Sequence, residues 1–194
     1  MIAIIDYDMG NLRSVENALS RAGAEFTVTS NPQVIQSAAK VLLPGVGNAA
    51  EAMSKLRDRG LVDVIRSLRR PVLGICIGMQ VLCNYSEEGD TPCVGLFDTD
   101  VRKFTPSQDM KVPHMGWNTI NNLDSKLFKG IDEGSFVYFV HSYRPGLCSD
   151  TIATSDYGGM FSAALKYENF YGTQFHPEKS GDIGERIIKN FLAL

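Results

Sequence analysis

The sequence predicts an α/β fold: an open, doubly wound, mainly parallel sheet flanked by helices, with an antiparallel excursion in the C-terminal half. Short, continuously apolar runs alternate with helical patterns over residues 1–75, as expected for parallel strands buried on both faces. After residue 100 the strand-like runs are separated only by turns, which indicates antiparallel pairing. No shift in composition marks a linker, so we expect a single domain over residues 1–194.

In the first part of the chain each predicted strand is followed by a helix. Asn11 is a suitable N-cap for the first long helix, which carries apolar residues at helical spacing and ends at Gly23. Strands are expected at 1–5, 26–28, 40–43 and 72–75, and helices at 12–22, just after Pro32, at 48–59 and at 61–68. This alternation predicts right-handed crossovers and a doubly wound sheet.

The second part of the chain begins with a polar, glycine-containing stretch at 84–91, which we interpret as a loop. Gly158-Gly159 and Glu168-Asn169 are hairpin-type turn signals. Strands are expected at 101–104, 119–120, 135–140, 151–154, 161–165 and 171–175, and a last helix at 182–194.

Composition and charge narrow the range of functions. The net charge is −3 and there is no basic run, so neither a nucleic acid nor a membrane surface is an expected partner. The N-terminal apolar stretch meets Asp6 after five residues, so it is neither a signal peptide nor a membrane span, and we expect a cytoplasmic protein. The four cysteines lack metal-ligand spacing and are expected to be reduced thiols; no metal and no cofactor are predicted.

Cys76 is the candidate nucleophile. It lies where the strand at 72–75 meets the start of a helix, with Gly74 and Gly78 on either side. A turn this tight holds the side chain at its apex outward, and the positive end of the following helix favours the thiolate, which is the reactive form. A buried structural cysteine is the alternative, because free cysteine is among the most buried residue types. The flanking glycines favour the nucleophile.

His176 is the candidate base. It directly follows an apolar strand, and Pro177 keeps the chain extended there. Side chains two residues apart in extended chain point the same way, so the carboxylate of Glu178 can orient the imidazole. A solvated surface turn is the alternative. The strand-end position favours a site, because ligands in doubly wound sheets gather at the carboxyl ends of strands.

Acyl transfer also needs N–H donors for the oxyanion. The Pro44–Gly47 loop follows the third strand, and its glycines permit Val46 and Gly47 to turn an N–H group into a cavity. Ile77, immediately after the nucleophile, supplies a second N–H. A loop of this kind is more often only a turn. The presence of Cys76 favours the interpretation of this loop as an oxyanion site.

Three stretches together resemble the class I glutamine amidotransferases: 44–47, 74–80 and 175–178, in that family's order and spacing. The resemblance spans the whole chain and implies a flavodoxin-like fold. It implies that Cys76 attacks the carboxamide of glutamine, that His176 protonates the departing ammonia, and that water hydrolyses the γ-glutamyl thioester, with Glu178 completing the triad. Glutamine would be held by Gln80, Glu88 and the backbone around Gly47, Ser142 and Tyr143.

The stretches at 112–118 and 138–144 resemble the glutaminase subunits of imidazole glycerol phosphate synthases. In that family the partner is a (β/α)8-barrel cyclase, which receives ammonia through an internal channel and makes imidazole glycerol phosphate in histidine biosynthesis. Because the hydrolase uses all 194 residues, we expect another chain to consume the ammonia in a heterodimer. The implied interface residues are His114, Met115, Trp117, Asn118 and Tyr138. Aromatic core is the alternative for Trp117 and Tyr138.

Two other functions stay open at this point. One is the glutaminase subunit of another synthase, such as pyridoxal phosphate synthase, which shares the triad; the residues at 114–118 favour the histidine pathway instead. The other is a non-catalytic module on the same fold that uses the pocket to sense an amide. The presence of cysteine, histidine and glutamate together argues against it.

Overall fold

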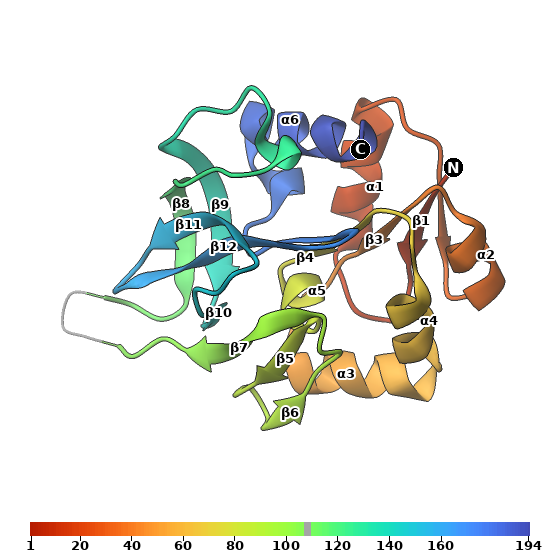
Figure 1. The fold of residues 1–194 in the computed structure, drawn as a ribbon, viewed down its shortest axis with the longest axis horizontal. Helices are drawn as coiled ribbons and strands as arrows, with labels where there is room; N and C mark the ends of the chain where they lie inside the picture. The colour runs from red at the N-terminus through yellow and green to blue at the C-terminus, as the bar shows by residue number, and fades with distance from the viewer. Residues whose placement is uncertain (107–109) are drawn as a thin grey trace.

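A seven-stranded mixed sheet forms the centre of the molecule in the computed structural model, which describes residues 1–106 and 110–194 (Figure 1). Along the sheet the order is β11-β12-β13-β4-β3-β1-β2. The strands are β1 Ile2–Ile5, β2 Phe26–Thr29, β3 Lys40–Leu43, β4 Val72–Ile75, β11 Thr151–Asp156, β12 Met160–Tyr167 and β13 Phe170–Thr173. The five strands from β2 to β13 are parallel, in the strand order of flavodoxin-like folds. At the other edge β12 pairs antiparallel with β13, and β11 pairs antiparallel with β12. The predicted fold class is confirmed.

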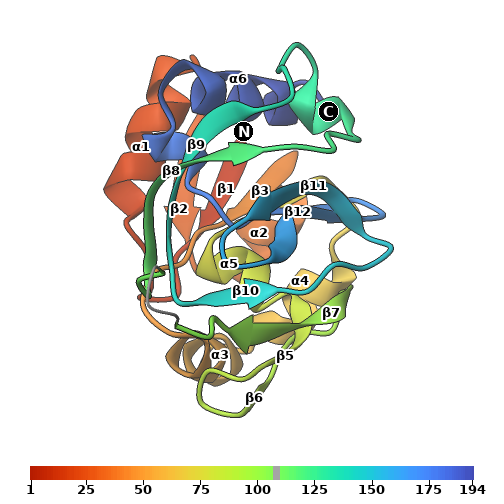
Figure 2. The same ribbon diagram turned by 90° about the vertical axis from the view of Figure 1, so that its left-hand side faces the viewer.

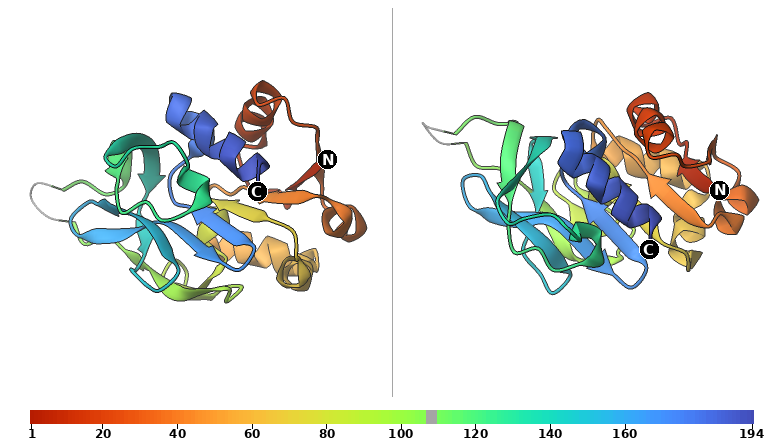
Figure 3. Two further views of the ribbon diagram at one scale, coloured as in Figure 1. Left: turned by 45° about the horizontal axis from the view of Figure 1, so that its top comes forward. Right: turned by 90° about the horizontal axis from the view of Figure 1, so that it is seen from above.

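Helices cover both faces of this sheet. α1 and α6 lie on one face and α3 and α4 on the other, with α2 packed against α4 (Figures 1 and 3). The helices are α1 Leu12–Arg21, α2 Pro32–Ser37, α3 Ala49–Asp58, α4 Leu61–Ser67, α5 Ile77–Gln80 and α6 Gly181–Leu192, with short 3-10 turns at Lys126–Phe128 and Pro177–Lys179. The apolar side chains of β1, β3 and β4 are buried on both faces, as the continuous apolar runs predict.

Asparagine residues are the N-caps of three of these helices. Asn11 accepts a hydrogen bond from the backbone N–H of Ser14 at the start of α1, as predicted. Asn31 and Asn48 cap α2 and α3 in the same way. These caps satisfy N–H groups that have no acceptor inside the helix, so they fix where each helix starts.

Two smaller sheets lie beside the central one. β5 (Cys83–Ser86), β6 (Thr91–Pro92), β7 (Phe97–Lys103) and β10 (Tyr143–Pro145) form one sheet, in the order β10-β7-β5-β6. β8 (His114–Ile120) and β9 (Ser135–His141) form an antiparallel pair. Figure 2 shows β10 next to α5, and the side chain of Gln80 in α5 donates to the carbonyl of Tyr143 in β10. This part of the second half of the chain therefore lies at the C-terminal end of β4.

The structure corrects three of the predicted elements. Both ends of the predicted loop at 84–91 are strands, because β5 pairs in parallel with β7 and buries Cys83 and Ser86. Pairing with a distant strand overrides a polar local sequence. The strand predicted at 119–120 is only the end of the seven-residue β8. The helix after Cys76 is a single turn that ends at Gln80, and β5 begins at Cys83.

Candidate active site

Cys76 lies on a sharp turn between β4 and α5. Its φ of 54° and ψ of −109° form a conformation that a residue other than glycine rarely adopts. The flanking glycines are sterically required. A Cβ on Gly78 would lie 1.8 Å from the backbone oxygen of Leu43, and a Cβ on Gly74 would lie 2.6 Å from that of Gly78. The close approach of β3 to this turn therefore depends on the Gly-x-Cys-x-Gly spacing.

His176 comes from the neighbouring strand. β13 pairs in parallel with β4, and the N–H of Cys76 donates to the carbonyl of Thr173 over 2.8 Å. The segments that follow these two strands therefore leave the sheet side by side. His176 Nδ1 lies 2.7 Å from Glu178 Oε1, and both side chains are 2% exposed. His176 Nε2 is buried and has no hydrogen-bond partner among the described residues. The carboxylate thus holds Nδ1, leaving Nε2 for the pocket.

The charges around His176 favour the imidazolium. Burial alone would lower the pKa of His176, but the thiolate of Cys76 and the hydrogen-bonded carboxylate of Glu178 outweigh it and raise the pKa to about 10. Glu178 itself lies among aliphatic side chains that include Leu73 and Ile188, so little water competes for the imidazole. A proton released by the thiol therefore has a stable place on His176.

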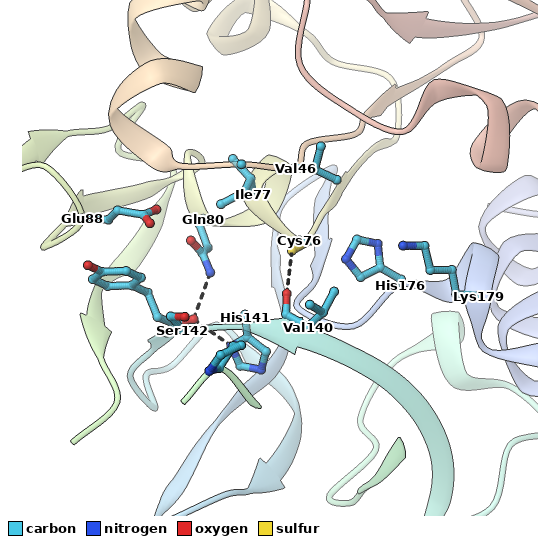
Figure 4. A pocket seen from close by; sticks show the side chains of 13 residues that line it. Val46, Cys76, Ile77, Gln80, Glu88, Val140, His141, Ser142, His176 and Lys179 are labelled. Carbon is cyan, nitrogen blue, oxygen red and sulfur yellow. Dashed lines mark hydrogen bonds between the residues drawn. The ribbon is translucent and has the colours of Figure 1, made fainter. Parts of the chain in front are cut away.

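These side chains line a pocket of about 290 Å³, close to the lower end of the range of roughly 300–1,000 Å³ for small-molecule sites. Figure 4 shows Cys76 in the middle, with His176 and Lys179 on one side and Gln80 and Glu88 on the other. The lining residues are Val46, Gly47, Cys76, Ile77, Gln80, Glu88, Pro113, Val140, His141, Ser142, Tyr143, His176 and Lys179. The structure thus brings together all of the residues predicted from the sequence for the oxyanion site and for glutamine binding.

The Pro44–Gly47 loop lies against the turn of Cys76. A Cβ on Gly45 would lie 2.8 Å from the nitrogen of Gly78, and the buried hydroxyl of Tyr7 donates to the carbonyl of Pro44 over 2.7 Å. Gly47 has a φ of +95°, which only glycine adopts without strain. Ile77 opens α5, so its N–H is one of those without an acceptor inside the helix. The loop and the helix start therefore border the same end of the pocket.

Two side chains form the far wall. Gln80 is 1% exposed, and its Nε2 donates to the carbonyl of Tyr143 over 3.0 Å. Its Oε1 is buried and has no partner among the described residues. Glu88 accepts the N–H of Ala49 over 2.8 Å, although burial raises the pKa of its carboxyl. A buried acceptor and a carboxylate suit a ligand that carries amide and amino groups.

The family profile described as "Glutamine amidotransferase class-I" matches residues 3–194. The chain belongs to the class I glutamine amidotransferases. A protein of Bacteroides fragilis named imidazole glycerol phosphate synthase subunit HisH is 56% identical over 194 residues, covering 100% of this chain and 99% of that protein. A protein of the same name from Xanthomonas campestris is 46% identical over 194 residues, covering 100% of this chain and 97% of its own.

Solved structures show the amidotransferase fold at much lower identity. A crystal structure described as a glutamine amidotransferase has a TM-score of 0.75 at 17% identity and covers 100% of this chain and 98% of its own. The structure of PurLQS from Thermotoga maritima has a TM-score of 0.73 at 18% identity, with 99% and 97% covered. At these identities the likeness concerns the fold alone.

Sequence reasoning missed four residues that line this amidotransferase pocket and one that lies behind it. Val140 presents its carbonyl oxygen 3.9 Å from Cys76 Sγ, and Pro113, His141 and Lys179 line the walls. Gln174 lies behind the sulfur, with its Nε2 3.7 Å from Sγ. Only Gln174 carried a usable signal, since it stands two residues before His176 at the same strand end.

The two other histidines form a buried pair. His141 Nδ1 lies 2.8 Å from the carbonyl of Tyr143, which can only accept, so Nδ1 carries the proton. His141 Nε2 then accepts from His114 Nδ1 over 3.0 Å, and His114 Nε2 accepts from Asn118 Nδ2 over 3.3 Å. Burial lowers the pKa of His114 to about 4 and that of His141 to about 3. Both rings are therefore neutral at physiological pH.

The β8–β9 pair separates the residues predicted for a partner interface into two sets. Met115 and Trp117 are 62% and 55% exposed, and Tyr138 packs edge-on against Trp117 with ring centroids 6.0 Å apart. His114 and Asn118 lie on the opposite face of β8, because alternate residues of a strand point to opposite sides. There they belong to the hydrogen-bonded row Asn118–His114–His141, which we call the histidine chain. Phe136, 58% exposed, extends the outward face, which we call the outer face of β8–β9.

Among the described residues, no group of three or more His, Cys, Asp or Glu side chains is arranged to hold a metal ion, and the four cysteines are free thiols. No helix in the described part of the chain has the length and apolar character needed to cross a bilayer.

Proposed function

We propose that the chain hydrolyses glutamine to glutamate and ammonia, as the glutaminase subunit of an imidazole glycerol phosphate synthase in histidine biosynthesis. One observation carries the chemistry: Cys76 and the His176–Glu178 pair meet at one pocket beside two sources of oxyanion N–H groups. Identity of 46–56% to HisH subunits over the whole chain supports the pathway. Every group in the hydrolysis is a side chain, a backbone N–H or water.

In the first half-reaction His176 Nε2 takes the proton of Cys76, and Sγ attacks the carboxamide carbon of glutamine. The oxyanion accepts from the N–H of Ile77 and from the loop at Val46 and Gly47. The tetrahedral species then collapses: the C–N bond breaks, His176 returns its proton to the nitrogen, and ammonia leaves a γ-glutamyl thioester.

In the second half-reaction His176 takes a proton from water, which attacks the thioester carbon through the same oxyanion site. The C–S bond breaks, glutamate forms, and Cys76 leaves as a thiolate. The imidazolium of His176, held by Glu178, stabilises that anion. The balance is one glutamine and one water consumed for one glutamate and one ammonia.

The proposed partner is a (β/α)8-barrel cyclase bound to the outer face of β8–β9 in a cytoplasmic heterodimer. Met115, Trp117 and Phe136 expose large apolar side chains there, which is the kind of surface that marks protein interfaces. Val140 belongs to β9 and also lines the pocket beside Cys76. A partner on this face would therefore stand next to the site where ammonia is released.

Replacing the nucleophile tests the chemistry. In the complex, Cys76→Ala should abolish glutamine-dependent synthesis of imidazole glycerol phosphate and leave ammonia-dependent synthesis intact. Cys148→Ala, which removes another free thiol, is the matched control and should retain both activities. Loss of both activities in Cys76→Ala would mean that the site is misassigned.

Glutamine turnover with and without the cyclase and its ribonucleotide ligand tests the partnership. We expect weak turnover alone and strong activation in the complex. Trp117→Ala should weaken cyclase binding by about 10- to 100-fold, while Tyr167→Ala, which alters an exposed aromatic residue of β12, should not. High glutamine turnover without the cyclase would contradict the proposed activation by the partner.

Two alternatives predict different outcomes. A glutaminase of another synthase, such as pyridoxal phosphate synthase, would be activated by that synthase and not by the cyclase. A module that only senses an amide would lack an activated thiolate. Labelling of Cys76 by a glutamine-mimicking electrophile therefore separates an enzyme from a sensor.

A further inference from the structure

Gln174 is a buried side chain placed behind the nucleophile. It is 0% exposed and follows directly after β13, where its N–H still donates to the carbonyl of Ala163 over 2.8 Å. Its side-chain Nε2 lies 3.7 Å from Cys76 Sγ, and its Oε1 accepts from Gln80 Nε2 over 2.8 Å. Gln174 does not line the pocket, so it reaches the sulfur from the protein side.

The hydrogen bonds fix which atom of Gln174 faces the sulfur. The carbonyl of Tyr143 can only accept, so the NH2 group of Gln80 must point at it. The second hydrogen of that NH2 group goes to Gln174, which therefore turns its oxygen toward Gln80. With the opposite orientation, two NH2 groups would face each other in a buried site. The group that remains for Cys76 is an N–H donor.

We propose that Gln174 is a further catalytic residue, which donates an amide hydrogen bond to the thiolate of Cys76. The proposal rests on the nucleophilic role of Cys76 described above. A hydrogen bond to the charged form of a group favours that form, and bonds to ions are stronger than bonds to neutral groups. Gln174 thus acts twice in each turnover: when the thiol loses its proton, and when the thiolate leaves the thioester.

The opposite contact of the sulfur shows why such a donor matters. The carbonyl oxygen of Val140 lies 3.9 Å from Sγ, where it can accept from the neutral thiol but repels a thiolate. Among the described residues, the hydrogen bond from Gln174 favours the anion, as the charge of His176 does. Gln80 holds Gln174 in place and is held by Tyr143, so the donor is oriented before glutamine binds.

The pH dependence of alkylation of Cys76 by iodoacetamide tests the proposal in the full-length chain, with the modified cysteine identified by mass spectrometry. In Gln174→Leu the midpoint of the rate profile should move up by about one to two pH units, since a hydrogen bond to an ion is worth roughly ten- to a hundredfold in population. The limiting rate at high pH should stay within about twofold. In Gln174→Glu, which keeps the acceptor for Gln80, the shift should be larger because a second anion faces the sulfur.

Thr173→Val is the matched control. It removes a buried hydroxyl that has no hydrogen-bond partner among the described residues, from the residue next to Gln174. Its alkylation profile should equal that of the unaltered chain, and its kcat in the complex should be unchanged, whereas Gln174→Leu should lower kcat by about tenfold. Profiles of Gln174→Leu and Thr173→Val that coincide, with both proteins folded by circular dichroism, would overturn the proposal.

A measurement on the unaltered chain covers the case in which Gln174 variants do not fold. One side-chain NH2 proton of Gln174 should shift in the NMR spectrum when Cys76 is alkylated, and it should titrate together with the sulfur. A resonance that does neither refutes the hydrogen bond. Failure of the underlying function looks different, because then Cys76→Ala would keep its glutaminase activity whatever Gln174 does.

Discussion

The three histidines of this chain occupy two opposite environments. His176 contacts a carboxylate and a potential thiolate, and these charges raise its pKa to about 10 despite burial. His114 and His141 contact each other, a carbonyl and aromatic rings, and burial lowers their pKa values to about 4 and 3. His114 is stacked on Tyr157, with centroids 4.0 Å apart and planes at 16°. The surroundings of this residue type therefore favour the charged form at one site and the neutral form at the other.

The difference lies in what each ring can do with a second proton. A charged His176 has Glu178 as its counter-ion, at 2.7 Å. A charged His114 would place its new N–H against the NH2 group of Asn118, which is already a donor. Burial alone thus does not decide the charge of a histidine, because neighbouring charges and the direction of the hydrogen bonds act together with it.

Replacing histidines in the two environments should change the glutaminase activity by very different amounts, and the loss of His176 should have the largest effect. His176→Asn should lower the kcat for glutamine hydrolysis in the complex by roughly 10⁵-fold, because loss of one triad member costs about as much as loss of all. His114→Asn should retain activity within about tenfold, since it exchanges protons with neither glutamine nor Cys76 in this site. Equal losses in steady-state assays would remove the distinction.

Glu178→Gln sharpens the comparison by leaving His176 in place without its counter-ion. The kcat should fall by roughly 10⁴-fold, because the amide neither fixes the tautomer nor stabilises the imidazolium. The pKa of His176, followed by NMR titration of the ring, should fall from its raised value. A ring that titrates as before would show that the thiolate of Cys76 alone sets it.

The pH dependence of stability probes the histidine pair. Unfolded histidine titrates at 6.5, so between that pH and about 4 the unfolded chain binds a proton that folded His114 does not. The contribution of the neutral histidines to the free energy of unfolding should therefore be complete above pH 6.5. It should decrease as the pH is lowered below 6.5, by up to about 1.4 kcal/mol per pH unit for each histidine. Urea unfolding of His114→Phe should show a shallower fall in this window. An unchanged slope would argue against a neutral His114.

The smallest effect is expected at the outer end of the histidine chain. Asn118 Nδ2 donates both to His114 Nε2 and to the carbonyl of Asp156, the latter over 2.9 Å. Asn118→Leu should lower the free energy of unfolding by about 1–3 kcal/mol, because the buried ring of His114 loses its donor. Thermal unfolding with Thr119→Val as the neighbouring control measures it. A neutral result would mean that water replaces the amide.

The sequence predicted the parallel half of the fold and the stretches that meet at the pocket because both depend on local patterns. Apolar runs specify buried strands, and glycines on either side of Cys76 specify a turn that other residues cannot make. β5 escaped prediction because its polar sequence becomes a strand only by pairing with β7. The placement of His114 and Asn118 behind the outer face also required the register of β8 with β9.

The sequence by itself determined which residue types could perform the chemistry: a cysteine on a turn, and a histidine with a carboxylate two residues away. Only the tertiary structure decided what surrounds them. Gln174 reaches Cys76 because β13 and β4 lie side by side, and its amide is oriented by Gln80 and the backbone of Tyr143 from other parts of the chain. Hydrogen bonds between residues nearly a hundred positions apart leave no periodic signal, because they arise only once the sheet has assembled.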